Sequence, residues 1–580
     1  MFNVTEPSDD QCDYTKVTVT LALLGAAYYI RTSELPSQSS LRSVGLGCKV
    51  SMSLHFEFGR TKARSFSLAS SAFLLAALVC LNSSCGGGHA AGIVPPPPAE
   101  SALTAAEVQL VVQNAALSAN APLAIAVTDR VGNILAVFRN PAAPSTSTGN
   151  FGATVDANEL AVALARTAAL FSNNQAPISS RTVRFISGIH FPPGVAFAPN
   201  ADLYGIENTN RGCPLNAAFL PGKSVPPSRS INGTDLGLGI LTGKVDPSDS
   251  DANAVNPGGV PLFKSGYAVG GVGVVSSSTD IAEYAAFSGA SASGFLPTAA
   301  QLPPPGVVIV GGIALPLVNQ TTAPPGVSPG STSGTYVVGP LAGVLAPTGD
   351  LVGPNAGASG LSQTDVATIV NQAVTTANAT RAVIRLPASS PTRMTIAVTD
   401  LDGTILALHR MPDATVFSID VAVAKARNVI FYSHPPATPE LPGIPSGTAV
   451  TNRTVGFGAQ PLFPPGIDGS GPGPFFSLFL ADLAQPCTQG SQPTNPNQNG
   501  VVFFPGSVPL YKSGILVGGL GVSGDGVDQD DYVTNGGAQG FTAPDAIRAD
   551  QVVINGVRLP YLKFPRNPAN STLRSAIPTP

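Results

Sequence analysis

The sequence predicts an α+β protein made of two tandem copies of one domain. A strand, glycine turn and second strand occur at residues 123–140 and again at residues 394–411, so the two hairpins start 271 residues apart. A capped helix precedes each hairpin, and a glycine-rich strand pair closes each copy. Recurrence of a whole set of motifs in one order indicates an internal duplication. We call the copies repeat one (residues 101–318) and repeat two (residues 361–565).

Composition excludes several classes of protein. Of 580 residues only 11% are charged, and the net charge of -4 leaves no basic stripe for nucleic acid. The 62 glycines and 55 prolines form about a fifth of the chain, which indicates long ordered loops. With 43% hydrophobic residues and a mean hydropathy of +0.23, the chain can build cores.

The N-terminal region reads as a secretory signal. A basic segment at residues 60–64 precedes an apolar run at residues 66–81 and a small-residue exit with Cys85. Cys85 makes the signal resemble that of a bacterial lipoprotein, which predicts lipid attachment there. Asn82 stands where such signals usually have leucine, so ordinary cleavage and an uncleaved anchor remain alternatives.

The position of this signal also suggests how the segments outside the two repeats are divided. Because a signal begins near a start codon, we expect translation to start at Met52 and residues 1–51 to be an extension, with the signal over 52–85. The proline-rich residues 86–100 predict a stiff spacer that holds the domains off a membrane of the bacterial cell envelope. Residues 566–580 are a tail.

Both repeats begin with the same helix signal. Residues 104–107 (TAAE) form a capping box, and residues 362–365 (SQTD) take the same place in repeat two. Apolar residues then recur on one helical face in each repeat. The first helix of each repeat is therefore predicted from two independent signals.

The hairpin and the helix after it follow in both repeats. Gly132 and Gly403 stand where the turn needs positive φ. A second helix is predicted at residues 159–168 and 420–429, and its many alanines let it approach the sheet closely.

Long Pro/Gly loops come next, too long to be simple connectors. Related sequences at residues 181–185 and 453–457 are expected to lie in these loops, as are the Phe-Pro-Pro-Gly motifs at 191–194 and 463–466. His190, beside the first such motif, is expected to be solvated.

Each repeat closes with a strand pair, at residues 260–274 and 508–522. A short apolar strand follows at 312–316 and 556–560. Between the repeats, residues 319–360 are rich in proline, glycine, serine and threonine and are predicted to be a linker.

This order of motifs resembles the GlcG/HbpS family of small haem-binding-type domains. Repeat two matches better, with AVAKAR at residues 422–427, GGLGVSG at 518–524 and an acidic helix start at 528–531. Repeat one departs from the pattern, with Leu164 in place of the lysine. The long loops, the linker and the terminal strands lie outside the resemblance.

The resemblance implies a profilin-like or PAS-like domain, an antiparallel sheet of about five strands flanked by helices. It also implies binding of haem or a related tetrapyrrole, and packing of domains as dimers or larger rings. The two repeats are therefore expected to form an internal pseudo-dimer across a pseudo-twofold axis, with higher oligomers open.

A haem site needs an axial donor, an apolar slot and cations for the propionates. Arg166 and Arg427 recur at one point of two diverged helices and are candidate carboxylate partners, with a cap or an inter-helix salt bridge as the structural alternative. Lys425 has no counterpart in repeat one, so a site kept in one repeat is expected in repeat two.

Two histidines are candidate axial ligands. His434 follows the second helix of repeat two, where repeat one has Asn173. His409 lies on the hairpin where repeat one has Phe138, which favours a packed or surface histidine. No metal-ligand spacing such as HxxxH or CxxC occurs.

Cys213 and Cys487 occupy equivalent loops, 274 residues apart. In an exported protein they predict a disulfide between the repeats. Free or separately paired thiols, and a metal or redox role, are the alternatives.

The sequence as a whole favours an exported, lipid-anchored binding protein for haem or a similar small cofactor. The first alternative is a ligand-free cell-surface scaffold whose long loops contact other proteins. The second is an enzyme acting on a small organic acid, although no catalytic constellation is visible in the sequence.

Overall fold

The computed structural model describes residues 99–198, 202–243, 255–434 and 440–569. The predicted signal, Cys85 and almost all of the spacer lie outside these ranges. Within them, no helix is both long enough and apolar enough to span a bilayer.

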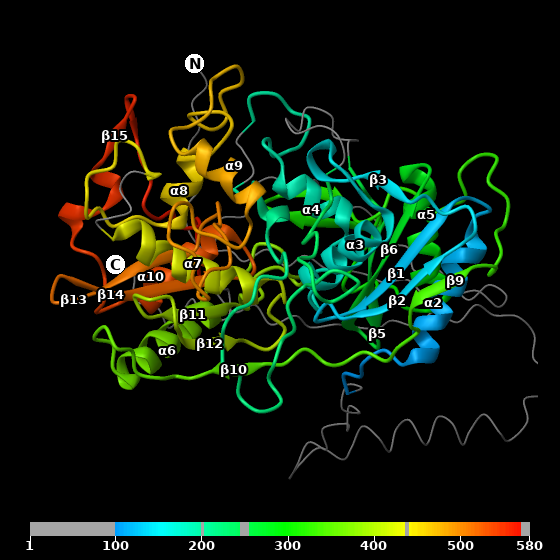
Figure 1. Cartoon of the computed structure of the whole chain (residues 1–580), viewed down its shortest axis with the longest axis horizontal. Coiled ribbons are helices and arrows are strands. Elements are labelled where there is room, and N and C mark those ends of the chain that lie inside the picture. The colour runs from blue at the N-terminus through cyan, green and yellow to red at the C-terminus, as the bar shows by residue number, and fades with distance from the viewer. Residues whose placement is uncertain (1–98, 199–201, 244–254, 435–439, 570–580) are drawn as a thin grey trace, which may run out of the picture. The chain divides into compact units, whose positions relative to one another are not determined.

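Repeat one contains both predicted helices, the hairpin and the closing strand pair (Figure 1). Its elements in chain order are α2 (Ala105–Ser118), β1 (Leu123–Asp129), β2 (Ile134–Arg139), β3 (Thr146–Thr148), β4 (Thr154–Asp156), α3 (Ala157–Phe171), α4 (Ser180–Ser187), β5 (Gly259–Lys264), β6 (Tyr267–Ser276), α5 (Thr279–Ala292), β7 (Val307–Val310) and β8 (Ile313–Pro316).

Repeat two has the same order except that no strands corresponding to β3 and β4 stand in the described residues between its hairpin and α7, and one extra helix, α9, lies in its long loop. Its elements are α6 (Gln363–Ala379), β11 (Thr395–Thr399), β12 (Ile405–Arg410), α7 (Ser418–Ser433), α8 (Asn452–Gly458), α9 (Phe476–Ala484), β13 (Ser507–Lys512), β14 (Ile515–Ser523), α10 (Val527–Gly537), β15 (Val553–Ile554) and β16 (Val557–Arg558).

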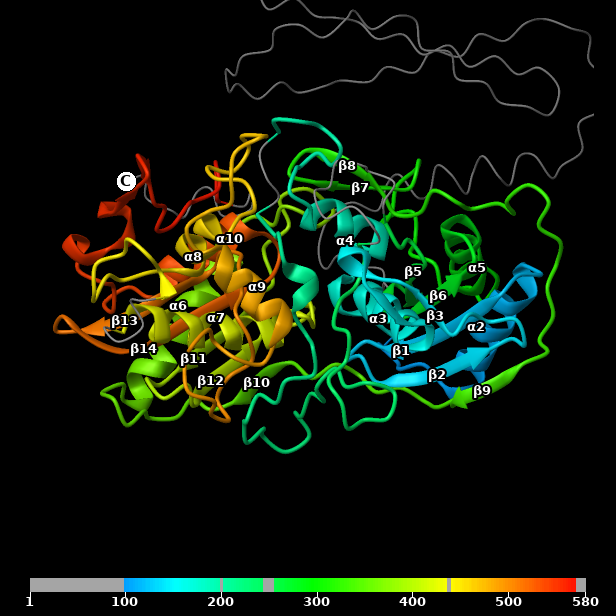
Figure 2. The same ribbon diagram turned by 45° about the horizontal axis from the view of Figure 1, so that its top comes forward.

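Each repeat holds a five-stranded antiparallel sheet, as the sequence predicted. The strand orders are β5-β6-β1-β2-β9 and β13-β14-β11-β12-β10, which are equivalent. The fifth strand of each sheet comes from the stretch expected to be a linker: β9 (Thr335–Val338) pairs with β2, and β10 (Gly349–Val352) pairs with β12 (Figure 2). This stretch therefore closes one edge of both sheets.

The two hairpins share the same register and the same irregularity. Val127 lies opposite Ala136, as Val398 lies opposite Ala407, and a bulge follows each pair. Gly132 and Gly403 have φ of 86° and 81°, which confirms the predicted positive φ.

Helices cover both faces of each sheet. In repeat one, α2 and α5 pack on one face and α3 on the other (Figures 1 and 2). The α3 and α7 helices approach unusually closely because glycine faces them: a Cβ on Gly273 would lie 1.9 Å from the carbonyl oxygen of Ala161, and one on Gly521 2.0 Å from that of Ala422. The glycine-rich strands are thus packing surfaces for the alanine-rich helices.

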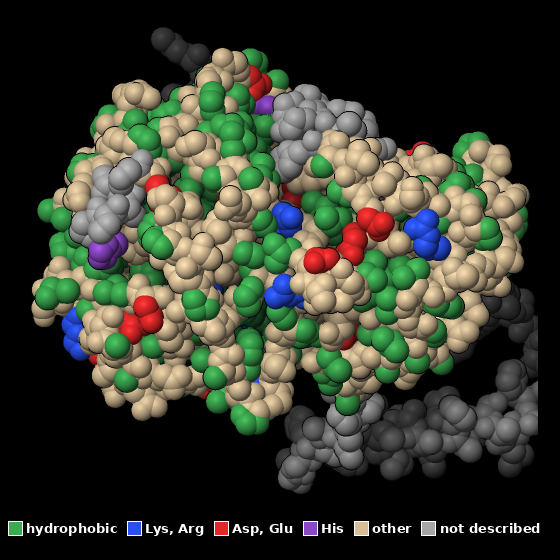
Figure 3. All heavy atoms as spheres, in the orientation of Figure 1, with side chains coloured by type: hydrophobic (Ala, Val, Ile, Leu, Met, Phe, Trp, Pro, Cys, Tyr) green, Lys and Arg blue, Asp and Glu red, His purple; other side chains and the backbone are tan. Residues whose placement is uncertain are grey.

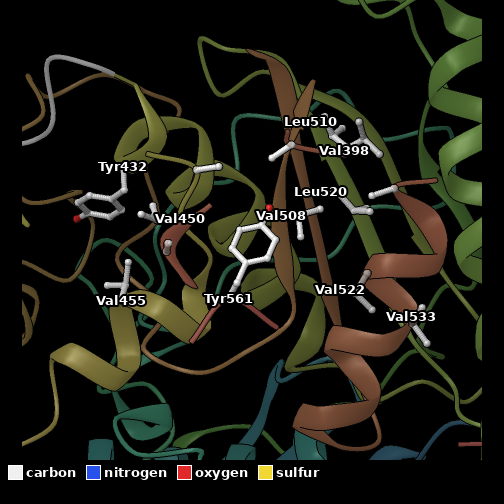
Figure 4. Close-up of a cluster of buried hydrophobic side chains, with 14 of the residues drawn as sticks. Val398, Tyr432, Val450, Val455, Val508, Leu510, Leu520, Val522, Val533 and Tyr561 are labelled. Carbon is white, nitrogen blue, oxygen red and sulfur yellow. The ribbon is translucent and has the colours of Figure 1, made fainter. Parts of the chain in front are cut away.

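The core of repeat two continues on the opposite face of the sheet. Leu520 and Val522 of β14 point toward Val533 of α10, and all three are fully buried (Figure 4). Alternation from Gly519 to Val522 thus gives the two glycines to the α7 face and Leu520 and Val522 to the other.

Residues 181–185 and 453–457 were expected in loops, and that expectation is wrong. They form α4 and α8, whose N-caps are the side chains of Ser179 and Thr451. Good caps outweigh the low helix propensity of the surrounding sequence.

An ion pair fixes each of these short helices to the last helix of its repeat. Arg181 Nε lies 2.8 Å from Glu283 Oε1, and Arg453 pairs in the same way with Asp531. The pair is therefore a duplicated structural contact.

Candidate functional site

The two recurring arginines hold the hairpin turns. Arg166 Nε donates to the carbonyl oxygen of Gly132, and Arg427 Nε donates to that of Gly403, both at 2.9 Å. A guanidinium beneath each turn satisfies a carbonyl that the glycine conformation leaves turned toward the helix.

Their remaining donors bind loops. Arg166 Nη1 lies 2.8 Å from the carbonyl oxygen of Arg229, and Arg427 Nη2 lies 2.7 Å from that of Leu215. Arg427 Nη1 also donates to Asn499 Oδ1 at 3.0 Å. Burial lowers the pKa of both arginines to about 10. These contacts favour the structural alternative, although the acceptors are carbonyls rather than a helix cap or a carboxylate.

Sequence reasoning missed an acidic partner seven residues before each arginine. Glu159 Oε1 accepts the backbone N–H of Ile231 at 2.8 Å, and Asp420 Oδ2 accepts that of Asn210 at 3.0 Å. Both acids belong to the recurring helix motif, so the signal was present in the sequence. Together with the arginines, they bind the backbone of one loop, residues 208–232 of repeat one.

Lys425 is fully buried and has protein partners. Its Nζ lies 2.8 Å from the carbonyl oxygen of Val522, 3.1 Å from Asp530 Oδ2 and 4.9 Å from the centre of the Phe504 ring. Burial lowers the pKa of Lys425 and raises that of Asp530 to about 7. Lys425 therefore has no surface from which to reach a ligand.

The two candidate histidines differ in their surroundings. His409 Nδ1 lies 2.7 Å from Asp350 Oδ1, across the pairing of β12 with β10. His434 ends α7 with an exposed side chain, and its ring has no protein partner within the described ranges. Its counterpart in repeat one, Asn173, is fully buried.

His190 was expected to be solvated, and that expectation is wrong. Its side chain is 7% exposed, and its Nε2 lies 2.5 Å from Asp468 Oδ1 in repeat two. Asp468 Oδ2 also accepts the backbone N–H of Phe197 at 2.8 Å. The loops that carry the two Phe-Pro-Pro-Gly motifs thus meet through this carboxylate.

Two contacts join equivalent positions of the repeats. Cys213 and Cys487 form a disulfide with a Cα–Cα distance of 5.5 Å. The side chain of Asn208 donates to that of Asp482, and these two residues are also 274 positions apart.

A cavity of about 600 Å³ lies beside the disulfide. Repeat one contributes Val131, Leu170, Asn210 and residues 212–219 and 225–228, and repeat two contributes Val416, just before α7, and the first turn of α7. The lining contains no lysine, arginine, histidine, methionine or tyrosine, and Cys213 is in the disulfide. The described residues also contain no cluster of three or more His, Cys, Asp or Glu that could hold a metal ion.

The fold and the duplicated contacts define a tandem protein of helix-covered, five-stranded antiparallel domains. A family model described as haem degrading protein HbpS-like matches residues 361–539. The matched range corresponds to repeat two, from the cap of α6 to the end of α10, so this repeat is similar to the HbpS-like family.

The chain is also similar to part of a curated protein. The chain is 27% identical over 151 residues to the corrinoid adenosyltransferase PduO of Salmonella typhimurium, which is 26% of this chain and 33% of that protein. The chain thus spans about a third of the length of this relative.

Two solved structures are also similar. The PduOC:haem complex is 24% identical, with 32% of this chain and 96% of that chain covered and a TM-score of 0.21. Klebsiella pneumoniae protein ORFY is 18% identical, with 32% and 88% covered and a TM-score of 0.19.

Proposed function

We propose that the chain is an exported, lipid-anchored protein that binds haem or a related tetrapyrrole without covalent attachment. The observation that carries the proposal is the HbpS-like match over residues 361–539.

His434 is the proposed axial ligand of the haem iron. His434 offers an exposed imidazole, which is a common axial ligand of haem iron. Lys425 and Arg427 already bind protein groups, so they are not proposed as partners of the propionates. Haem held in this way would supply a redox-active iron.

Repeat two is the proposed binding repeat. Repeat one has buried Asn173 in place of His434 and Leu164 in place of Lys425. The cavity beside the disulfide offers no axial donor, so it is not the proposed haem site.

The repeats are proposed to form an internal pseudo-dimer. The contacts of Cys213 with Cys487 and of Asn208 with Asp482 support it, because an isologous interface places equivalent residues against each other near its axis.

Anchoring in the cell envelope rests on the signal sequence and Cys85. The mature protein is expected to begin at Cys85 with a lipid on its N-terminal residue. Mass spectrometry of the mature N-terminal peptide checks this, and an unmodified N-terminus at another residue would contradict it.

The haem proposal is tested by titration of the purified protein with haemin. We expect a shift of the Soret band that is lost in His434→Ala. The matched control is His409→Ala, which removes an imidazole already bonded to Asp350 and should keep the shift. Equal spectra of both variants and the wild type would show that His434 is not the axial ligand.

A ligand-free scaffold is the second candidate, favoured by one feature of the surface. The loops with the Phe-Pro-Pro-Gly motifs expose Val195, Phe197 and Ile467 by 50%, 70% and 52%. Charged side chains are sparse on the face drawn in Figure 3. Absence of any Soret shift in the wild type would favour this candidate.

A further inference from the structure

We propose that the cavity between the repeats is a second ligand site, for a small and largely apolar molecule that carries an amine or hydroxyl donor. Asp420 is the residue that binds this donor. The site is distinct from the proposed haem site at His434, and it does not depend on haem binding.

The walls of the cavity are mainly apolar. Val131 and Leu170 face it from repeat one, and Val416 and Ile419 face it from repeat two. Its volume of about 600 Å³ lies within the usual range for a small-molecule pocket. Apolar walls with a few polar groups bind the body of a ligand by burial and orient it by hydrogen bonds.

Asp420 is the one ionisable side chain in the lining, apart from the disulfide-bonded Cys213. Its carboxylate accepts the N–H of Asn210 at 3.0 Å and the amide of Asn499 at 3.2 Å. A carboxylate has about four acceptor positions, so a further donor can be bound. A single carboxylate without a cation in the lining favours an amine or a hydroxyl and disfavours an anion.

The nearby Arg427 does not change this conclusion. Its guanidinium is within electrostatic reach of Asp420, but each of its three nitrogens already donates to the protein. An anionic ligand would therefore have to compete with these buried bonds.

The cavity wall formed by repeat one is fixed at several points. Cys213 is tied to repeat two by the disulfide, and the carbonyl of Leu215 is held by Arg427. Farther along, the N–H of Leu220 donates to the carbonyl of Leu351 at 2.8 Å, and Lys223 Nζ donates to that of Thr348 at 2.6 Å. A wall that is already ordered loses little entropy when a ligand binds.

Repeat one offers an internal control. Glu159 is the counterpart of Asp420 and also accepts a backbone N–H, that of Ile231, but it does not line the cavity. Glutamine at this position keeps an acceptor for Ile231. The variant Glu159→Gln therefore changes an equivalent acid without touching the proposed site.

The test compares three probes with the same apolar body: 1-naphthylmethylamine, 1-naphthalenemethanol and 1-naphthoate. The protein has no tryptophan, so naphthalene fluorescence reports binding without an indole background. We expect the amine to bind at least about tenfold more tightly than the acid, with the alcohol between them. Asp420→Asn should remove most of this preference, and Glu159→Gln should keep it.

Location is tested by filling the cavity. Ala217→Phe, which adds a ring to the wall, should abolish binding of all three probes and leave the circular dichroism spectrum and the haemin titration unchanged. The proposal is overturned if the amine shows no saturable binding or if the acid binds as tightly. It is also overturned if Ala217→Phe binds the amine as the wild type does.

Discussion

Lys425 and Asp530 show at the scale of single residues how the repeats have diverged. They form a buried ion pair in repeat two, whereas the equivalent positions in repeat one are Leu164 and Ala282. Removing one partner of a buried pair leaves an uncompensated charge, while an apolar replacement of both is often neutral or stabilising.

Lys425→Leu alone should therefore lower the free energy of unfolding by about 3 kcal/mol. Adding Asp530→Ala should recover most of that loss, because the double variant recreates the apolar pair of repeat one. Urea unfolding of the two single variants and the double variant measures the coupling. Additive losses would contradict this account of the pair.

The burial of Asp482 should make the free energy of unfolding depend on pH. It is buried beside Asn208, its Oδ1 accepts the N–H of Val501 at 2.7 Å, and burial raises its pKa from 3.8 to about 8. Because the folded state binds this proton more tightly, the resulting stabilisation is complete below about pH 4 and is lost as the pH rises toward 8.

Asp482→Asn copies the residue of repeat one and should flatten this dependence. The free energy of unfolding in urea, measured at pH 5 and pH 8, should fall less in the variant, by up to about 1.4 kcal/mol per pH unit. Burial also raises the pKa of Asp530, so part of the pH dependence of the unfolding free energy should persist in the variant. An unchanged difference between the two pH values would show that Asp482 does not carry the proton.

At the scale of elements, the contact of α7 with β14 depends on glycine. A Cβ at position 521 would overlap the carbonyl oxygen of Ala422, so α7 would have to move away from the sheet. The same argument applies to Gly273 and α3 in repeat one.

Gly521→Ala should therefore cost about 2 kcal/mol or more of unfolding free energy. Gly471→Ala is the control, since a Cβ there meets no atom within 4 Å and its φ is not in the left-handed region. That change should stay within about 0.5 kcal/mol in urea unfolding. Equal losses of unfolding free energy in the two variants would mean that position 521 does not require glycine for the close approach of α7 to β14.

The elements that the sequence predicts well are those with local signals. Caps and apolar stripes predicted α2 and α6. The alternation of apolar and small residues on either side of Gly132 and Gly403 predicted the hairpins. The edge strands β9 and β10 were missed because their hydrogen-bond partners are far along the chain. A proline-rich, glycine-rich composition conceals such strands.

The candidate site was predicted only in part for a similar reason. Recurrence marked Arg166 and Arg427 as important, but their acceptors are carbonyls of loops that no sequence pattern locates. Exposure of His434 and burial of Lys425 are also properties of the folded chain.

At the scale of the whole molecule, one loop of repeat one ties the repeats together. Residues 208–232 bind the acid and arginine of both recurring helices, and Cys213 adds the disulfide to Cys487. A cross-link between positions 274 apart restricts the unfolded chain over a long loop.

Replacing both Cys213 and Cys487 by serine should lower the free energy of unfolding by about 2–4 kcal/mol. Urea unfolding checks this, with the wild type in dithiothreitol as the reduced control. A non-reducing peptide map of the wild type should contain the linked peptides. A map without them would contradict the link.

The most direct test of the proposed function is the stoichiometry of haemin binding to the whole protein. Calorimetric titration should give one haemin per chain, because repeat two presents His434 and repeat one has a buried asparagine in its place. Two equivalents per chain, or none, would contradict a single haem site in repeat two.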